Sequence, residues 1–261
     1  MADKDWSAAQ YDKFTKERKL PAVELAYAVS CGGAVIRSAI DIGCGSGFST
    51  GAVAKAFPNA EITGIDFSED MLAAAKKKYP DIDFRRMSVP DELELLGRKY
   101  DLVFSNACIQ WIPDHKTLIP RLFSLLNDGG VLAVQIPDQA AHPVHALIDR
   151  LTASDEWRAK FPHVREHNNL TADEYYNVLE SLSGDFRLWE TTYYHTMPSH
   201  ESIVEWYKGT GLKPYLEQLG EDDKNIFLCT FLDELRRIYP LTPSGNIIFR
   251  FPRLFFTAVK A

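Results

Sequence analysis

The chain is poor in cysteine and has no long hydrophobic run. Both features limit the classes of protein to which it can belong. Its 261 residues include four cysteines, and no two of them have Cys-x-x-Cys spacing. The sequence therefore indicates neither a zinc site nor a disulfide framework, and it favours a reduced, cytoplasmic setting. No apolar run reaches the ~18 residues of a membrane span. The charged residues 1–5 lack a hydrophobic signal region, so we expect no membrane association.

Basic residues are outnumbered by acidic ones. The 29 Lys and Arg against 36 Asp and Glu give a formal net charge of −7, which argues against a general nucleic-acid binder. An anionic small substrate stays possible, because a few placed arginines can bind it. The hydrophobic share of 46% is typical of a soluble globular protein, and the length suits one large α/β domain, or at a stretch two small ones. No obligate protein partner is evident.

Histidines are present, but their spacing does not suggest a metal site. We expect surface positions for the four in the middle of the chain, which are His142, His145, His163 and His167. No metal is predicted.

A glycine-rich stretch at residues 41–47, Asp-Ile-Gly-Cys-Gly-Ser-Gly, organises the rest of the chain. An apolar run precedes it and a helix-like run follows it, which gives the order strand, glycine turn, helix. Glycine serves where the chain reverses tightly or where backbone must touch a ligand. The next helix begins with unpaired N–H groups and a partial positive charge. The stretch is suited to a nucleotide-like or zwitterionic ligand, although an ordinary strand–helix turn is the alternative.

A second feature supports the ligand site. Residues 61–66 predict a strand that ends in Asp66, about 20 residues after Gly47. In doubly wound nucleotide-binding sheets, an acid at this distance receives the ribose hydroxyls. Further strands are predicted at 83–87, 100–107 and 131–136, with helices between them. This alternation indicates a parallel sheet with helices on both faces, and it places Asn106 at the same crevice as the glycine turn.

The ends of the chain depart from that alternation. Residues 6–29 predict helix, with a kink and a second helix starting at Pro21. A helix at 118–126 should end at the Asn-Asp-Gly-Gly of 127–130. Beyond it we expect mostly helix at 137–182, an alternating strand at 186–195, helices at 203–210 and 215–239, and a last strand at 254–260.

The spacing GxGxG after Asp41 resembles motif I of the class I S-adenosylmethionine-dependent methyltransferases. That resemblance implies a Rossmann-like, mostly parallel seven-stranded sheet with an antiparallel last strand. It implies that Gly43, Gly45 and Gly47 approach the methionine part of S-adenosylmethionine, and that Asp66 takes the ribose. Further cofactor contacts are expected from Asp41, Phe67, Met71 and Asn106. The third strand usually ends in an acid that binds the adenine amino group, but this chain has Ser88 there. We expect Ser88 to lie at the cofactor, with Asp91 or a backbone group in place of the usual acid.

A narrower resemblance rests on segments outside the cofactor motifs. The start of the chain, Gln110–His115, residues 191–200, residues 204–214 and Phe251–Phe255 are similar to the bacterial trans-aconitate 2-methyltransferases. The resemblance implies one domain, with an N-terminal helical lid at 1–30, a cofactor-binding core at 34–136, a helical segment at 137–182 and a helical cap at 196–246. The middle of the chain, 140–184, fits this pattern less clearly.

The implied reaction is monomethyl esterification of a carboxylate of trans-aconitate. An aliphatic carboxyl has a pKa near ~4, so it is ionised at neutral pH and needs no general base. We therefore expect no catalytic acid or base, only positioning of the carboxylate, by Tyr11, Trp111 and Tyr194. Arginine pairs bidentately with carboxylate, so Arg18 and Arg253 are the leading candidates for holding the tricarboxylate, followed by Lys213 and His195.

Three alternatives stay open at this point. Another small carboxylic acid, or an oxygen or nitrogen nucleophile, could replace trans-aconitate, because fold alone does not select a substrate. An NAD-dependent oxidoreductase is disfavoured by the GxGxG spacing. A non-catalytic cofactor-binding regulator is disfavoured by the intact glycines and Asp66.

Overall fold

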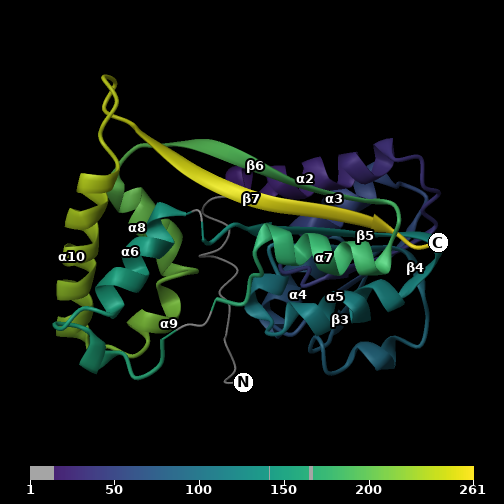
Figure 1. Cartoon of the computed structure of the whole chain (residues 1–261), viewed down its shortest axis with the longest axis horizontal. Helices are drawn as coiled ribbons and strands as arrows, with labels where there is room; N and C mark the ends of the chain where they lie inside the picture. The colour runs from purple at the N-terminus through teal and green to yellow at the C-terminus, as the bar shows by residue number, and fades with distance from the viewer. Residues whose placement is uncertain (1–14, 141, 165–166) are drawn as a thin grey trace. The chain divides into compact units, whose positions relative to one another are not determined.

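The computed structural model describes residues 15–140, 142–164 and 167–261 (Figure 1). Side chains are described from Lys19 onward. A seven-stranded sheet has the order β3-β2-β1-β4-β5-β7-β6. Pairings among β1 to β5 are parallel, and β7 runs antiparallel to β5. The predicted Rossmann-like fold with an antiparallel last strand is thereby confirmed. The strands are β1 Ser38–Ile42, β2 Glu61–Asp66, β3 Asp83–Arg86, β4 Tyr100–Asn106, β5 Leu126–Pro137, β6 Phe186–Met197 and β7 Ile247–Val259.

The chain divides into two compact units, each described by itself. The first unit comprises residues 1–137, 168–191 and 253–261, and the second comprises 138–167 and 192–252. The boundaries fall within β6 and close to Arg253 in β7. The segment predicted as one helical stretch at 137–182 is therefore split, because α6 (Pro143–Thr152) belongs to the second unit and α7 (Ala172–Leu182) to the first.

Helices cover both faces of the sheet in the first unit. Helix α5 (His115–Ser124) and α7 pack on the face that carries Ile40, Val103 and Leu132. Helix α2 (Thr15–Cys31) packs against α3 (Phe48–Ala56) and β5 on the opposite face, where α4 (Glu69–Lys78) also lies. This double cover explains why β1 is buried along its whole length and shows no alternation of polar and apolar residues. Short 3₁₀ turns at Leu93–Leu96 and Ile109–Trp111 complete the unit.

Strand order reverses between β1 and β4. From β1 the chain proceeds outward to β2 and β3, then returns to place β4 on the other side of β1. In open parallel sheets, ligands bind outside the carboxyl ends of the strands at such a switch point. The glycine turn after β1 and the loop after β4 both lie at that edge.

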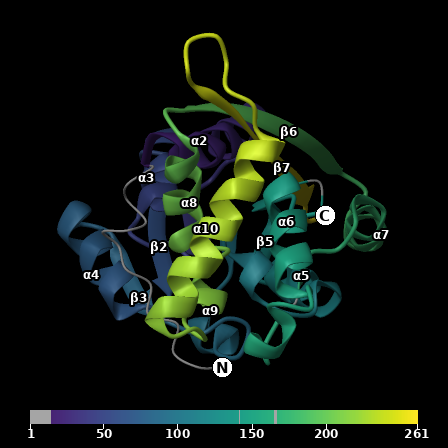
Figure 2. The same ribbon diagram turned by 90° about the vertical axis from the view of Figure 1, so that its left-hand side faces the viewer.

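The second unit is mainly helical. Helices α6, α8 (His200–Lys208) and α10 (Glu221–Ile238) pack together, with the short α9 (Lys213–Leu216) and a 3₁₀ turn at Arg158–Lys160 (Figure 2). Among the residues described in either unit, no helix combines the length and the apolar character needed to cross a membrane.

The prediction of four surface histidines is wrong for two of them. His142 and His145 are buried among aromatic rings of the second unit, with the His142 ring centroid 4.6 Å from that of Phe251. His142 also caps α6, since its Nδ1 accepts a hydrogen bond from the Val144 N–H at 3.2 Å. An imidazole that fills both roles is held inside by packing and capping, which spacing along the sequence does not reveal.

Two helix boundaries also differ from the prediction. No second helix starts at Pro21, because α2 continues through it. Ala22, Leu25 and Val29 on one face of this helix are buried, and this packing outweighs the loss of the hydrogen bond that proline cannot donate. The predicted helix at 215–239 is interrupted, and α10 begins only after Gly220.

The Asn-Asp-Gly-Gly segment at 127–130 was expected to end a helix, but it lies inside β5. Helix α5 already ends at Ser124, and Leu126 pairs with Tyr100. The register between β4 and β5 then shifts, so the segment forms an irregularity that precedes the regular pairing of Leu102 with Val131.

Candidate active site

The glycine turn is tied to the end of β2 by backbone bonds. The N–H groups of Gly43 and Cys44 both donate to the Ile65 carbonyl, at 2.8 and 2.9 Å. Gly43, Gly45 and Gly47 have φ of +69°, +53° and +83°, in the left-handed region that favours glycine. A Cβ on Gly43 would stand 2.1 Å from the Cys108 Sγ, so this glycine lets the loops after β1 and β4 touch. A Cβ on Gly45 would meet nothing within 4 Å, so open space lies beside this backbone.

Asp66 closes the turn from the neighbouring strand. Its Oδ2 accepts the Gly45 N–H and its Oδ1 accepts the Ser68 N–H, both at 2.9 Å. Burial raises the pKa of the Asp66 carboxyl, and the bonds from Ser68 and Gly45 oppose that rise. A carboxylate oxygen can accept more than one hydrogen bond. Both oxygens therefore retain capacity for the paired hydroxyls of a ribose.

Asp41 lies beneath the turn and is fully buried. Its Oδ2 accepts bonds from the hydroxyls of Ser49 at 2.7 Å and Thr50 at 2.6 Å, both on α3. Its Oδ1 has no hydrogen-bond partner within the described part of the chain. Burial raises the Asp41 pKa to about 6, against the lowering effect of the two hydroxyls. A buried, partly satisfied acid beside the turn suits a cationic ligand.

The loops after β2 and β3 provide the adenine side of the predicted site. Phe67, next to Asp66, is exposed and can present its ring to a ligand, whereas Met71 is buried. Ser88 N–H donates to the Glu92 carboxylate at 2.6 Å. Glu92 was not predicted, and it brings an acid to the end of β3 where the family pattern has one.

The loop after β4 carries a strained residue at the same edge. Ala107 has φ +53°, a conformation that a residue with a Cβ adopts at a cost of about 1–2 kcal/mol. Its N–H donates to the Gln135 carbonyl, and its own carbonyl accepts the Gln110 Nε2 at 2.7 Å. These bonds hold Asn106 and Trp111 at the carboxyl end of the sheet.

The His115 side chain connects this loop to helix α7. Its Nε2 lies 2.8 Å from the Ile109 carbonyl and its Nδ1 lies 2.6 Å from the Tyr175 hydroxyl on α7. Because a carbonyl can only accept, Nε2 carries the proton and Nδ1 accepts from the tyrosine. Burial lowers the pKa of His115, which keeps the imidazole neutral.

The predicted substrate residues fall in different places. Arg253 is buried, with 5% of its surface exposed, and pairs with Pro137 at the carboxyl end of β5. In the second unit, Lys213 forms an ion pair with Glu217 at 2.5 Å, and His195 packs on Trp206. Tyr194 lies on β6 with two thirds of its surface exposed, so it lines no dry pocket within its unit. Tyr11 and the side chain of Arg18 lie outside the described residues.

Neither thiol near the turn is an activated nucleophile. Burial raises the pKa of the Cys44 and Cys108 thiols, which keeps both protonated. The geometry at this edge is that of a binding site, and the expectation that positioning alone suffices for the reaction stays a prediction.

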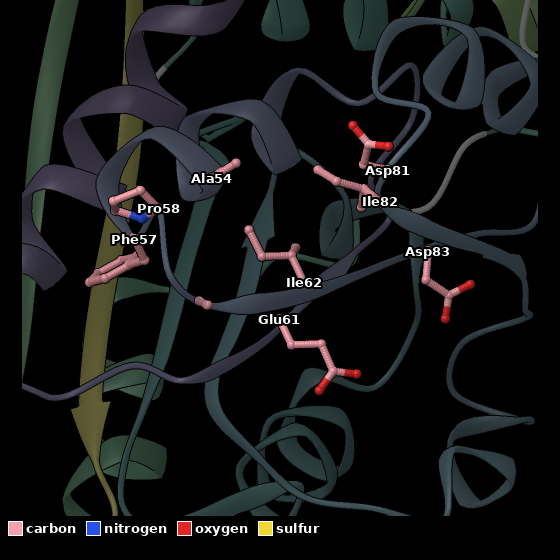
Figure 3. A pocket seen from close by; sticks show the side chains of 9 residues that line it. Ala54, Phe57, Pro58, Glu61, Ile62, Asp81, Ile82 and Asp83 are labelled. Atoms are coloured by element: carbon pink, nitrogen blue, oxygen red, sulfur yellow. The ribbon is translucent and has the colours of Figure 1, made fainter.

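A surface hollow of about 290 Å³ lies at the other end of the strands, beside Glu61 and Asp83, where β2 and β3 begin (Figure 3). Its carboxylates point in different directions rather than toward one ligand. Glu61 is paired with Arg98 at 2.8 Å, and Asp83 with Arg85 at 2.6 Å. This hollow is separate from the carboxyl edge.

Two comparisons with known proteins agree with a ligand site at the carboxyl edge of the sheet. Residues 39–130 match the family model described as a methyltransferase domain. A trans-aconitate 2-methyltransferase from Escherichia coli (strain 55989 / EAEC) is 39% identical over 254 residues, which is 97% of this chain and 98% of the relative. The chain belongs to the trans-aconitate 2-methyltransferase family. The oxidoreductase alternative is set aside, and the enzyme is a methyltransferase.

Solved structures share the fold of this methyltransferase at low identity. The YcgJ protein from Bacillus subtilis has a TM-score of 0.56 at 16% identity, covering 91% of this chain and 98% of that one. The plantazolicin methyltransferase BpumL, solved with a desmethyl analogue and S-adenosylhomocysteine, has a TM-score of 0.55 at 16% identity, with coverages of 97% and 89%. Both likenesses concern the fold alone.

Sequence reasoning missed several residues at the carboxyl edge of the sheet. They are Glu92, Gln135, Asn169 and Tyr175, which bond to this edge or face it. Of these, Glu92 could have been found as a nearby acid once Ser88 failed to match the family pattern. The others come from segments distant in sequence, and only the folding of the chain brings them together.

Proposed function

We propose that this methyltransferase transfers a methyl group from S-adenosylmethionine to a carboxylate of trans-aconitate and forms the monomethyl ester. The full-length relationship to enzymes of that name carries the proposal. The buried Arg253 at the carboxyl edge supports an anionic substrate. A cytoplasmic location, where free thiols such as Cys44 persist, belongs to the same proposal.

The residues of the glycine turn fit the cofactor. The open space beside Gly45 admits a ligand against the backbone, and the Asp66 oxygens can accept ribose hydroxyls. Phe67 offers an exposed ring for adenine. The proposed cofactor contacts are Asp41, Gly43, Gly45, Gly47, Asp66, Phe67, Ser88, Glu92 and Asn106. Met71 is a buried residue of α4, and its backbone N–H donates a hydrogen bond to the Ser68 hydroxyl at 3.4 Å.

S-adenosylmethionine held by these residues would supply an electrophilic methyl on its sulfonium. A carboxylate oxygen would bond to that methyl carbon as its bond to sulfur breaks, and S-adenosylhomocysteine would be the leaving group. The substrate carboxylate is already ionised at neutral pH, so no residue has to remove a proton. What the chain contributes is alignment of the attacking oxygen and exclusion of water. Trp111, in the 3₁₀ turn after β4, is the proposed apolar wall, and Arg253 holds a carboxylate that does not react.

The test is methyl transfer from labelled S-adenosylmethionine to a panel of acids. The panel contains trans-aconitate, cis-aconitate, citrate, isocitrate and a monocarboxylic acid. A preference of at least tenfold in kcat/KM for trans-aconitate supports the proposal. Faster turnover of the monocarboxylic acid would instead favour the alternative of another small carboxylic acid as substrate. If the protein binds the cofactor but methylates none of these acids, the proposed cofactor site stands and the proposed substrate is wrong.

A further inference from the structure

Gln135 on β5 is fully buried, and neither atom of its amide has a hydrogen-bond partner in the described structure. Each of the other glutamines in the described residues makes at least one side-chain hydrogen bond. Gln110 donates to the Ala107 carbonyl, and Gln218 bonds the backbone of His163 and Pro214. A carboxamide has two donors and two acceptor lone pairs, and burying all of them without partners is strongly unfavourable. Such a group in a native protein calls for a functional explanation.

The register places this amide at the carboxyl edge. Gln135 pairs with Asn106, the last residue of β4, and registered partners in a parallel pair point to the same face. The Asn106 Oδ1 is also buried, and within the described residues it has no partner. Asp41 lies on this face too, because it pairs with Phe104, two residues before Asn106. The Gln135 and Asn106 amides therefore lie side by side on β5 and β4. The end of β2 lies on the other side of the switch point.

The next strand of the sheet, β7, carries a buried cation. Gln135 pairs with Phe255 on β7, and Arg253, two residues away on the same strand, projects to the same face. An anionic substrate held by Arg253 therefore has the Gln135 amide as its neighbour along the sheet. Asp66, the proposed ribose ligand, ends β2 on the opposite side of β1. The acid substrate and the ribose consequently have separate places along one edge.

We infer that the Gln135 amide, with Asn106 beside it, binds the carboxylate that attacks the methyl group and thereby determines the orientation of the substrate. This inference rests on the proposed function. Carboxylate charge is lost as the ester forms, so a cation bonded to the attacking oxygen would stabilise the bound substrate more than the transition state. A neutral amide N–H aligns the oxygen with a smaller penalty of this kind. Arg253 can then hold a carboxylate whose charge does not change.

The first variant is Gln135→Met, which keeps the length of the side chain and removes its polar atoms. We expect kcat/KM for trans-aconitate to fall about 10- to 100-fold, because one or two bonds in the transition state are lost. The KM for S-adenosylmethionine should change less than about threefold. The Tm should equal or exceed that of the wild type, since an unpartnered polar group has been removed from the interior. A glutamine with only a structural role would give the reverse, with normal kinetics or a lower Tm.

Two further variants sharpen the comparison. Gln135→Glu keeps the shape and replaces the NH₂ donors by an acceptor oxygen, so kcat/KM for trans-aconitate should fall at least as far as in Gln135→Met. Gln218→Met makes the same chemical change at a satisfied glutamine of the second unit. It should lower the Tm and leave the ratio of kcat/KM values among the acids unchanged. Wild-type kcat/KM in Gln135→Met would overturn the inference.

A binding measurement separates this inference from the proposed function. Calorimetry of trans-aconitate with the S-adenosylhomocysteine complex of each variant requires no turnover. If the wild type binds the acid without methylating it, and Gln135→Met weakens binding at least tenfold, the reaction is wrong and the carboxylate site stands. If Gln135→Met binds and turns over trans-aconitate as the wild type does, the inference fails while the proposed function stands. If the wild type does not bind the acid at all, both are overturned.

Discussion

Replacing Asp41 by asparagine should stabilise the fold at neutral pH and weaken cofactor binding. Burial raises the pKa of this fully buried acid from 3.8 to about 6. Each unit corresponds to about 1.36 kcal/mol, so ionised Asp41 costs the folded state about 3 kcal/mol above pH 7. Asparagine keeps an oxygen for the Ser49 and Thr50 hydroxyls and avoids the buried charge.

The sign of the pH dependence follows from the same shift. Between pH 3.8 and about 6 the folded chain binds more protons than the unfolded chain at this site, so this site reduces stability as pH rises through the window. The advantage of Asp41→Asn should therefore be about 1.5 kcal/mol at pH 5 and about 3 kcal/mol at pH 7.5. Chemical denaturation at the two pH values measures it, with the exposed Asp81→Asn as the matched control.

Two results would refute this reasoning. A less stable Asp41→Asn at pH 7.5 would mean that the carboxylate gains more from its hydroxyl bonds than it loses by burial. A pH-independent difference between the two chains would mean that Asp41 does not titrate in this range. Calorimetric titration with S-adenosylhomocysteine should in addition show weaker binding to the variant, since the buried negative charge would be gone.

Three further changes test other parts of the site. Asp66→Ala should weaken cofactor binding by about 1.5–3 kcal/mol for each lost bond to the carboxylate, measured by titration; unchanged affinity would remove Asp66 from the site. Arg253→Ala should raise the KM for trans-aconitate much more than the KM for the cofactor, whereas equal effects would point to a folding defect. His115→Gln should lessen the loss of stability as pH falls through 6.5, because the buried wild-type imidazole has a lowered pKa; parallel Tm profiles from pH 5 to 8 would contradict this.

The cofactor half of the site could be predicted because its signal is local. The strand, the glycine turn and Asp66 lie within one short segment, and each glycine is required by a positive φ or a close contact. Glu92 escaped notice because the acid at the end of β3 comes from a turn four residues after Ser88 instead of from the strand.

The substrate half depends on contacts between distant segments. Nothing in the sequence around Gln135 distinguishes it from other polar residues, and only the register with Asn106 and Phe255 gives it a place. His142 and His145 were misjudged for the same reason, since their burial is decided by rings far along the chain. Pro21 shows that a helix breaker can be overruled by the packing of the helix that contains it.

The pairing of β5 with β7 also has a consequence for synthesis of the chain. The ladder from Val131↔Val259 to Pro137↔Arg253 joins β5 to a strand that is translated much later. While the residues between them are translated, the nascent sheet ends in the unpaired backbone groups of β5, a strand with apolar side chains such as Val134 and Ile136. An exposed edge of this kind recruits other strands and promotes aggregation. On the ribosome, we expect the enzyme to depend on chaperones until β7 emerges.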